Sequence, residues 1–303
     1  MNKNTMNIAF CFDNNYALGY LVTMISLFEN NKSENIKVYL ITPGLSDDVQ
    51  SKFKKLAQLY NQTIVVKNMD EHLFDGLPMV KPFGKATYFR YTIPDLCPEE
   101  KVLQLDGDIL VRKNLREMYD TDLTGVAMAV VEGQSSDDIY NINRLQVNSP
   151  TFNNGVQLMN LKYWREHNVA KTCRDYLIGH RNICIYVDQD ANNVVLHDKV
   201  KYLPYTYNMQ QVFFWDEGKL RLHFSKWPEL KKYLKDPSIV HYCSSMKPWI
   251  KGCDEPFCAE WREYARMYDF VEFKEQPLHS FLYRCVYYIG NTIVPKLLNI
   301  IKK

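Results

Sequence analysis

Residues 8–42 read IAFCFDNNYALGYLVTMISLFENNKSENIKVYLIT. The run at residues 8–12 is short and apolar and ends in a polar DNN segment, which predicts a buried strand followed by a loop. Residues 16–30 repeat apolar side chains at helical spacing, which predicts an amphipathic helix. A second apolar run at residues 36–42 stops at a Pro-Gly pair, as a strand does before a turn.

The flanking sequence continues this alternation. Residues 47–60 predict a helix and residues 63–67 a third strand, so the order β-α-β-α-β favours an α/β protein with a parallel, Rossmann-like sheet. Ligands of such sheets bind beyond the carboxyl ends of the strands, where Asp13 and Asn15 fall. Later segments predict a helix at 87–93, strands at 101–105, 125–131 and 156–161, and a helix at 162–178.

Composition narrows the class of protein. With 303 residues, 46% hydrophobic and 24% charged, the chain has a globular composition, which excludes disorder, collagen and coiled coil. A net charge of +2 is too small to favour nucleic acid as a partner. Residues 277–303 hold four of the 37 Lys and Arg and no Asp or Glu, which leaves 33 against 35 acidic residues elsewhere. We therefore expect one domain at residues 1–270 and a basic, aromatic tail at 271–303.

Cysteines and apolar runs indicate the compartment. The eight cysteines are scattered without a CxxC motif, which predicts free thiols in a reducing environment. The first apolar run is too short for a secretory signal, and no stretch is long enough for a spanning helix. We expect a cytoplasmic protein.

Several common active-site motifs are absent from the sequence: GxGxxG, GxxxxGK[ST], GxSxG and HExxH. This removes the usual dehydrogenase, P-loop, serine hydrolase and zincin interpretations. For an α/β protein, the interpretation that remains is a site that binds a nucleotide through a metal ion and not through a glycine-rich loop.

Two motifs indicate such a site. In QLDGDILV (104–111), Asp106 and Asp108 follow an apolar strand and could hold Mn²⁺ or Mg²⁺ together with a phosphate. The alternative is an ordinary Asp-Gly-Asp turn. In IVHYCSSMKPW (239–249), His241 could complete the metal site and Lys247 could bind phosphate. The alternative is a strand-terminal histidine in an aromatic neighbourhood.

Three further motifs carry polar groups suited to sugar or phosphate. Asn153 precedes an apolar run and could bind hydroxyls, unless the segment is a plain Asn-Gly turn. Asp188, Gln189 and Asp190 could cap a helix, bind sugar hydroxyls or stabilise an oxocarbenium charge. Arg90 could pair with phosphate or lie on the surface of its helix.

Taken together and in this order, these segments resemble glycosyltransferase family 8, which includes bacterial lipooligosaccharide galactosyl- and glucosyltransferases and, more distantly, glycogenin. The resemblance covers about residues 7–252 and rests on IAFCFDNNY, ATYFRYTIP, QLDGDILVRKNL, TDL (121–123), FNNGVQLMNLKYWRE, DQDANN and HYCSSMKPW. It implies a GT-A fold, a Rossmann-like mixed sheet flanked by helices. It also implies retaining transfer of a hexose from a UDP-sugar with Mn²⁺, for which Mg²⁺ is the alternative.

The resemblance assigns a role to each motif residue. Asp13, Asn15 and Tyr16 would hold uracil and ribose, and Arg90 and Asp106 would contact the donor. The metal would be ligated by Asp106, Asp108 and His241, and the diphosphate bound by Lys247. Asn153, Asp188 and Gln189 would surround the hexose, and Asp190 would be the carboxylate nearest its reacting face. This sequence departs from the family pattern at two places. It has Ser244-Ser245-Met246 in the expected phosphate loop, where Gly-Pro is common, and Glu132 in the expected hexose site, where Asp is common.

The expected activity is transfer of galactose or glucose to a surface-glycan acceptor such as lipopolysaccharide. Retention could use a carboxylate nucleophile or front-face attack, and we favour the latter because Gln189 is a poor nucleophile. The alternatives are a glycogenin-like or protein-directed glucosyltransferase, or an inactive UDP-sugar-binding protein. The tail predicts a peripheral anchor on the anionic inner face of the cell membrane, with a C-terminal helix docked on the domain as the alternative.

Overall fold

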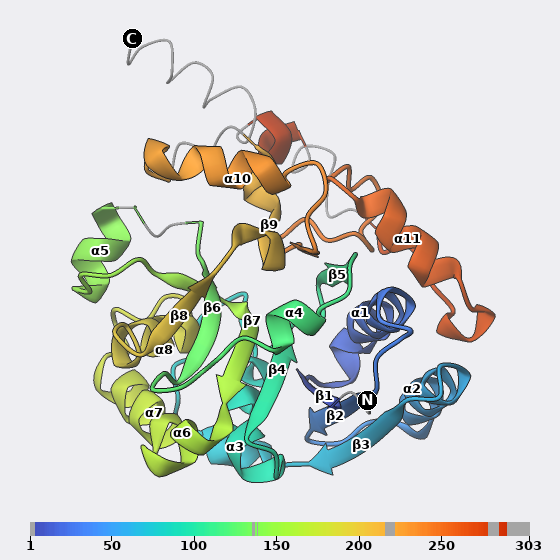
Figure 1. The fold of residues 1–303 in the computed structure, drawn as a ribbon, viewed down its shortest axis with the longest axis horizontal. Coiled ribbons are helices and arrows are strands. Elements are labelled where there is room, and N and C mark those ends of the chain that lie inside the picture. Colours follow the sequence, from blue (N-terminus) through green and yellow to red (C-terminus); the bar gives the residue numbers. More distant parts are fainter. Residues whose placement is uncertain (1–3, 135–136, 138, 216–221, 278–284, 290–303) are drawn as a thin grey trace.

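The computed structural model describes residues 4–134, 137, 139–215, 222–277 and 285–289. Its centre is a seven-stranded sheet in the order β3-β2-β1-β4-β7-β6-β8 (Figure 1). Neighbouring strands are parallel except for β7, which runs antiparallel to both β4 and β6. The expected mixed sheet is therefore confirmed. The strands are β1 (Met6–Cys11), β2 (Ile36–Thr42), β3 (Thr63–Asn68), β4 (Lys101–Leu105), β6 (Met128–Glu132), β7 (Phe152–Asn160) and β8 (Val200–Leu203).

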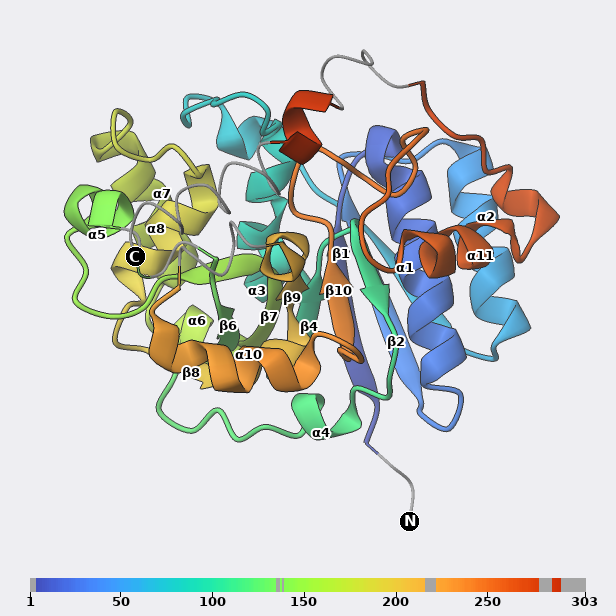
Figure 2. The same cartoon turned by 90° about the horizontal axis from the view of Figure 1, so that it is seen from above.

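Helices cover both faces of this sheet (Figure 2). Successive residues of β1 point to opposite faces, so Ile8 and Phe10 pack in one core cluster and Ala9 and Cys11 in another. The first cluster includes residues of α1 (Ala17–Asn30), α2 (Asp47–Leu59), α4 (Arg116–Tyr119) and α10 (Trp227–Tyr233). The second includes residues of α3 (Ile93–Leu96), α6 (Leu161–Glu166), α7 (Val169–Gly179) and α8 (Val187–Val195).

A small second sheet positions the later motifs. Its order is β5 (Ile109–Val111), β10 (Ile239–His241) and β9 (Met209–Gln210). Because β10 runs antiparallel to β5 with His241 opposite Ile109, residues far apart in the sequence meet directly after the Asp-Gly-Asp turn. Among the described residues, α5 (Ile139–Leu145) and α11 (Cys258–Arg266) are two further helices. Shorter 3-10 helices are η1 (Asn14–Tyr16), η2 (Glu71–Phe74), η3 (Lys85–Thr92), η4 (Tyr205–Tyr207), η5 (Gln211–Phe214), η6 (Phe224–Lys226) and η7 (Asp269–Val271).

Four predicted elements differ from the structure in helix type, in continuity or by at least three residues at one end. The helix expected at 87–93 is the 3-10 helix η3 followed by α3, which accommodates Pro94 in its first turn, where a missing N–H costs nothing. The helix expected at 162–178 is broken at Asn168, whose φ is 51°. The strand expected at 125–131 is β6, which begins only at Met128, because Gly125 has a φ of 76° and is not extended. Strand β7 begins earlier than expected and takes in residues 153–155.

Candidate functional site

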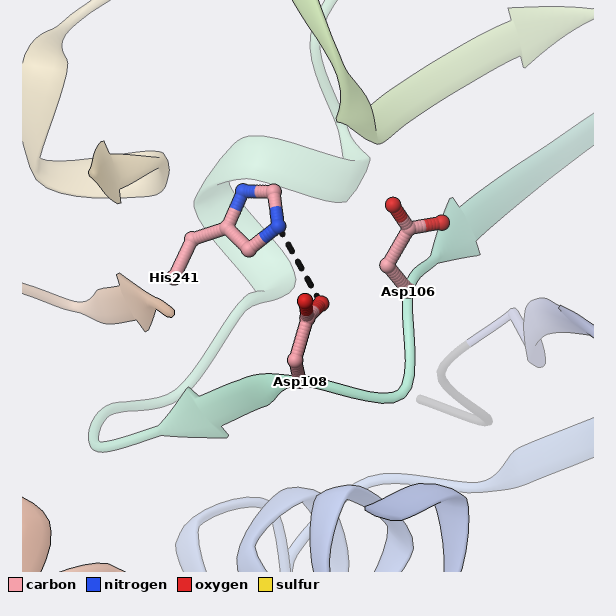
Figure 3. Close-up of side chains that lie close together, drawn as sticks. All are labelled: Asp106, Asp108 and His241. Carbon is pink, nitrogen blue, oxygen red and sulfur yellow. Dashed lines mark ion pairs between the residues drawn. The ribbon is translucent and has the colours of Figure 1, made fainter. Parts of the chain in front are cut away.

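The Asp-Gly-Asp turn and the end of β10 form one acidic cluster. Asp106 follows β4, Asp108 precedes β5, and His241 ends β10 (Figure 3). One ligand atom from each of these three residues lies within 4.8 Å of the others. The His241 and Asp108 side chains are 3% and 10% exposed, and His241 Nε2 is 3.2 Å from Asp108 Oδ1. The structure thus brings together the three predicted metal ligands, and the motif is a turn as well.

Two glycines allow the elements around this cluster to approach closely. A Cβ atom on Gly155 would lie 2.1 Å from Cε1 of His241, and one on Gly107 would lie 2.5 Å from Cδ2 of Tyr20. Neither position can hold a side chain without moving a buried ring. The glycines therefore set the positions of the histidine and of the turn.

A chain of hydrogen bonds fixes the tautomer of His241. The backbone N–H of Gly155 donates to Asn153 Oδ1 (2.9 Å), which also accepts from Asn208 Nδ2 (2.9 Å). This orientation leaves Asn208 Oδ1 to accept from His241 Nδ1, at 3.0 Å. Because Nδ1 carries the proton, the Nε2 of a neutral ring presents its lone pair toward Asp108.

The donor set fits a divalent cation. Two carboxylates and an imidazole nitrogen are ligands that Mn²⁺ or Mg²⁺ accepts. An imidazole lone pair and a carboxylate oxygen that face each other can share a cation, either a proton or a metal ion, and Asn208 supplies the outer hydrogen bond that metal-bound histidines usually have. Burial would raise the pKa of Asp108, but the charge of Lys247 and, when its ring is protonated, that of His241 outweigh burial and hold that pKa below its ordinary value.

Lys247 lies on the loop that follows β10. Its Nζ donates to Asp108 Oδ2 and to the Tyr242 carbonyl oxygen. Lys247 thus lies directly beside the acidic cluster. Its ammonium group could also bind a phosphate that is held by a metal ion at this cluster. The same loop carries Ser244, whose hydroxyl bonds to Tyr287 Oη (2.8 Å) and accepts from Met246 N (3.2 Å).

Arg90 joins the cluster to the next group of predicted residues. Its side chain is 7% exposed and lies 3.1 Å from both Asp106 Oδ1, through Nη2, and Asp188 Oδ2, through Nε. Burial would lower the pKa of Arg90, but Asp188 and Asp106 raise it, so the guanidinium stays charged. Arg90 is therefore a buried bridge between two carboxylates and not a residue on the surface of a helix.

The DQD motif occupies the first turn of α8, and its three side chains point to different partners. Asp188 accepts from Thr87 Oγ1 (2.5 Å) and from Asn154 Nδ2 (2.7 Å). Gln189 Oε1 accepts from Asn153 Nδ2 (3.1 Å) and from the backbone N–H of Asn154 (3.2 Å). Because a backbone N–H must meet an oxygen, the Gln189 Nε2 group is left to donate elsewhere. The N-cap of α8 is Tyr186, so none of the three is the capping residue.

Asp190 is enclosed on the other side of that turn. Both of its oxygens accept from Arg144, at 2.5 and 3.0 Å, and Oδ2 also accepts from the backbone N–H of Tyr186 (2.8 Å). Its side chain is 2% exposed. Asp190 is thus the partner of a bidentate, buried ion pair.

The residues expected to hold a nucleotide base lie at the end of β1. Asp13 accepts from the backbone N–H of Asn15 (2.9 Å) and caps η1. Asn15 and Tyr16 are exposed, and the Tyr16 ring meets the Trp249 ring edge-on, with centroids 5.8 Å apart. Since Trp249 ends the motif that carries His241 and Lys247, these exposed residues border the same site.

Some residues of the site gave no sequence signal. Asn208 is fully buried in a segment without periodicity, and Gln104 Nε2 donates to Asp106 Oδ1 (2.9 Å) from within a strand. Glu132, the glutamate at a position where the family commonly has aspartate, accepts hydrogen bonds from Tyr205 Oη (2.9 Å) and from Lys226 Nζ. In the sequence, only this departure from the family pattern drew attention to Glu132.

Comparisons with known proteins place this geometry in a family. The model of glycosyl transferase family 8 matches residues 7–253. The lipopolysaccharide 1,2-glucosyltransferase of Escherichia coli (strain K12) is 27% identical over 257 residues, which is 83% of this chain and 75% of that protein. The lipopolysaccharide 1,3-galactosyltransferase of Salmonella typhimurium is 27% identical over 257 residues, with 80% and 72% covered.

A solved structure agrees in fold. The galactosyltransferase LgtC, crystallised with donor and acceptor sugar analogs, superposes with a TM-score of 0.77 at 24% identity, covering 86% of this chain and 95% of that one. The expected GT-A fold is confirmed by this match and by the mixed sheet flanked by helices. Since the family model covers most of its length, the chain belongs to glycosyltransferase family 8.

Proposed function

We propose that this glycosyltransferase transfers galactose or glucose from a UDP-sugar, with retention of configuration, to a bacterial surface glycan such as lipopolysaccharide. One observation carries the proposal: the acidic cluster is continuous, through Asn208 and Asn153, with the amide and carboxylate groups at the start of α8. A site that binds a metal diphosphate at one end and hydroxyls at the other fits a nucleotide-sugar. Two of the relatives are named as a glucosyl- and a galactosyltransferase acting on lipopolysaccharide.

The metal would be held by Asp106, Asp108 and His241. Mn²⁺ or Mg²⁺ bound there would neutralise charge that develops on the diphosphate leaving group. Lys247 would add a second positive charge on the same side, which stabilises UDP as the glycosidic bond breaks. Arg90 keeps Asp106 oriented because it donates to that carboxylate from a buried position. Asp13, Asn15 and Tyr16 would hold uracil and ribose.

The neighbours of α8 favour front-face attack. Asp188 is bound by Arg90, Thr87 and Asn154, and Asp190 by Arg144, so every oxygen of the two carboxylates already has a protein partner. In the proposed step the acceptor hydroxyl oxygen bonds to the anomeric carbon on the side of the departing phosphate. The hydroxyl proton passes to a phosphate oxygen, and UDP leaves. Gln189 Nε2 and Asn153 would bind the hexose, and Gln189 would act beside the reacting carbon as a hydrogen-bond donor and not as a nucleophile.

The C-terminal tail is proposed to bring the enzyme to a membrane surface. Of the tail, residues 271–277 and 285–289 lie within the described structure, and the basic end at 290–303 lies outside it. Tyr288 Oη accepts from the backbone N–H of Asp254 (2.8 Å), so part of the tail docks on the domain. Within the described residues, no helix is both long and apolar enough to cross a bilayer. We keep the division at residue 270, with a peripheral, cytoplasmic-face enzyme as the proposal.

Donor turnover tests the proposal without knowledge of the acceptor. Purified full-length protein is incubated with UDP-galactose, UDP-glucose and other UDP-hexoses, with Mn²⁺ or with EDTA, and released UDP is measured. We expect slow, metal-dependent release from one or both of the two named donors, and none above background for Asp106→Ala. UDP binding without release would favour an inactive binding protein, and release unaffected by EDTA would overturn the metal assignment.

A further inference from the structure

The first turn of α8 has a backbone conformation that its sequence does not favour. Val187, the first residue of the helix, has a φ of 41° and is buried. A β-branched residue in the left-handed region is an outlier, because its Cβ crowds the backbone. Such strain persists only where surrounding contacts hold it, and it is concentrated at functional sites. Asp188, Gln189 and Asp190 follow immediately, so the strained turn determines where their side chains point.

Arg144 supplies contacts that hold this turn from outside the sheet. It lies on α5, between β6 and β7, and its guanidinium donates to both oxygens of Asp190. The same guanidinium donates to the carbonyl oxygen of Ile183 and lies 5.6 Å from the centre of the Tyr186 ring. Asp190 in turn accepts from the backbone N–H of Tyr186 (2.8 Å). Arg144 therefore contacts the chain before the turn and, through Asp190, the chain after it.

The pair is too enclosed to be an ordinary surface ion pair. The Arg144 and Asp190 side chains are 6% and 2% exposed. Asn141 Oδ1 also accepts from Arg144 Nη2, at 2.8 Å. Removing one charge of such a pair leaves the other buried and unmatched, whereas removing both is much less harmful.

We propose that Arg144 is a positioning residue for transfer: by holding Asp190 and the Ile183–Tyr186 backbone, it fixes the turn that presents Gln189 to the hexose. This inference rests on the proposed function of the site. Arg144 is connected to the acidic cluster indirectly. It bonds to Asp190 on α8, and Gln189 of the same helix bonds to Asn153 on β7, which leads to the cluster. Loss of Arg144 should therefore lower kcat more than it weakens UDP binding. Asp190 then acts as the anchor of the turn and not as a nucleophile.

The test is a double-mutant cycle of Arg144→Met and Asp190→Asn in the full chain, with Arg144→Lys and the control Arg174→Met on α7. The kcat for UDP-hexose turnover and the UDP affinity with Mn²⁺ are measured for each variant. We expect Arg144→Met to lower kcat about 10-fold or more, because a small displacement of Gln189 misaligns the hexose, with UDP affinity unchanged within about 2-fold. Arg144→Lys should be intermediate because a lysine cannot form the bidentate pair. The double variant should be no slower than Arg144→Met, and the control should match the wild type.

An outcome with Asp190→Asn inactive and Arg144→Met at the wild-type kcat would overturn the proposal, since Asp190 would then act without its partner. Lower thermal stability with unchanged kcat would also overturn it, because the role would be structural only. Amide hydrogen exchange at residues 186–190 gives a readout that needs no activity: we expect faster exchange in Arg144→Lys, and unchanged exchange would contradict the positioning role. The wild type could turn over no UDP-hexose while Arg144→Lys still speeds amide exchange at residues 186–190. In that case the proposed function would be wrong, but the role of Arg144 in holding the turn would stand.

Discussion

Gly155→Ala should displace His241 and weaken metal binding. The new Cβ would lie 2.1 Å from Cε1, 2.8 Å from Nδ1 and 2.9 Å from Nε2 of the imidazole, whereas ordinary contact begins at 3.4 Å. The ring would have to move by about 1.3 Å, although His241 is buried and its ring lies directly against Gly155 of β7. A movement of that size breaks the 3.0 Å bond from Nδ1 to Asn208 and withdraws Nε2 from Asp108. Loss of such an orienting bond typically costs about 10- to 100-fold in metal affinity.

The assay is titration of Mn²⁺ into the protein with UDP present, followed by electron paramagnetic resonance of free Mn²⁺. Gly179→Ala is the matched control, because a Cβ at that helix end meets nothing within 4 Å. We expect the control to bind Mn²⁺ as the wild type does and Gly155→Ala to bind at least about 10-fold more weakly. A folded Gly155→Ala protein with wild-type Mn²⁺ affinity would refute the assignment of His241 as a ligand.

Three further changes test neighbouring parts of the account. Asn208→Leu removes the acceptor that holds the proton on His241 Nδ1, so Mn²⁺ affinity should fall by about 10- to 100-fold in the same titration, and an unchanged affinity would contradict the tautomer argument. Gly107→Ala places a Cβ 2.5 Å from the buried Tyr20 ring, so urea unfolding should show a loss of about 1–3 kcal/mol, and no loss would show that the turn can move. Burial raises the pKa of Glu255. The contribution of Glu255 to the free energy of unfolding is therefore most favourable at low pH, where the carboxyl is protonated, and is lost as the pH rises through the raised pKa. Glu255→Gln should therefore gain thermal stability relative to the wild type between pH 4 and pH 7, and a constant difference would contradict the shift.

The fold could be predicted where local pattern and topology agree. Residues 8–67 alternate apolar runs with an amphipathic helix, and their order leaves little choice beyond a parallel sheet. The break at Asn168 and the 3-10 geometry of η3 could not be predicted, because both depend on tertiary packing that overrides propensity. β7 begins at Phe152 because Phe152 pairs with Glu132 of β6 beyond a register shift, which an Asn-Asn-Gly segment does not indicate.

The site could be predicted as residue types but not as a network. Asp106, Asp108 and His241 carry a chemical signature, and the structure brings them within one cluster. Asn208 and Arg144 lie in segments that have no motif, and only the fold brings them to His241 and Asp190. Asp190 appeared as a candidate for the reacting face, because the sequence could not show that both of its oxygens are bound by an arginine.

The central claim is transfer of a hexose from a UDP-sugar with retention. Its most direct test is the anomeric configuration of the product, followed by proton NMR from the first minutes of turnover of UDP-galactose and UDP-glucose with Mn²⁺ by the full-length protein. We predict release of UDP together with a hexose or hexoside that first appears as the α-anomer. A first-formed β-anomer, or no release of UDP from either donor, would contradict it.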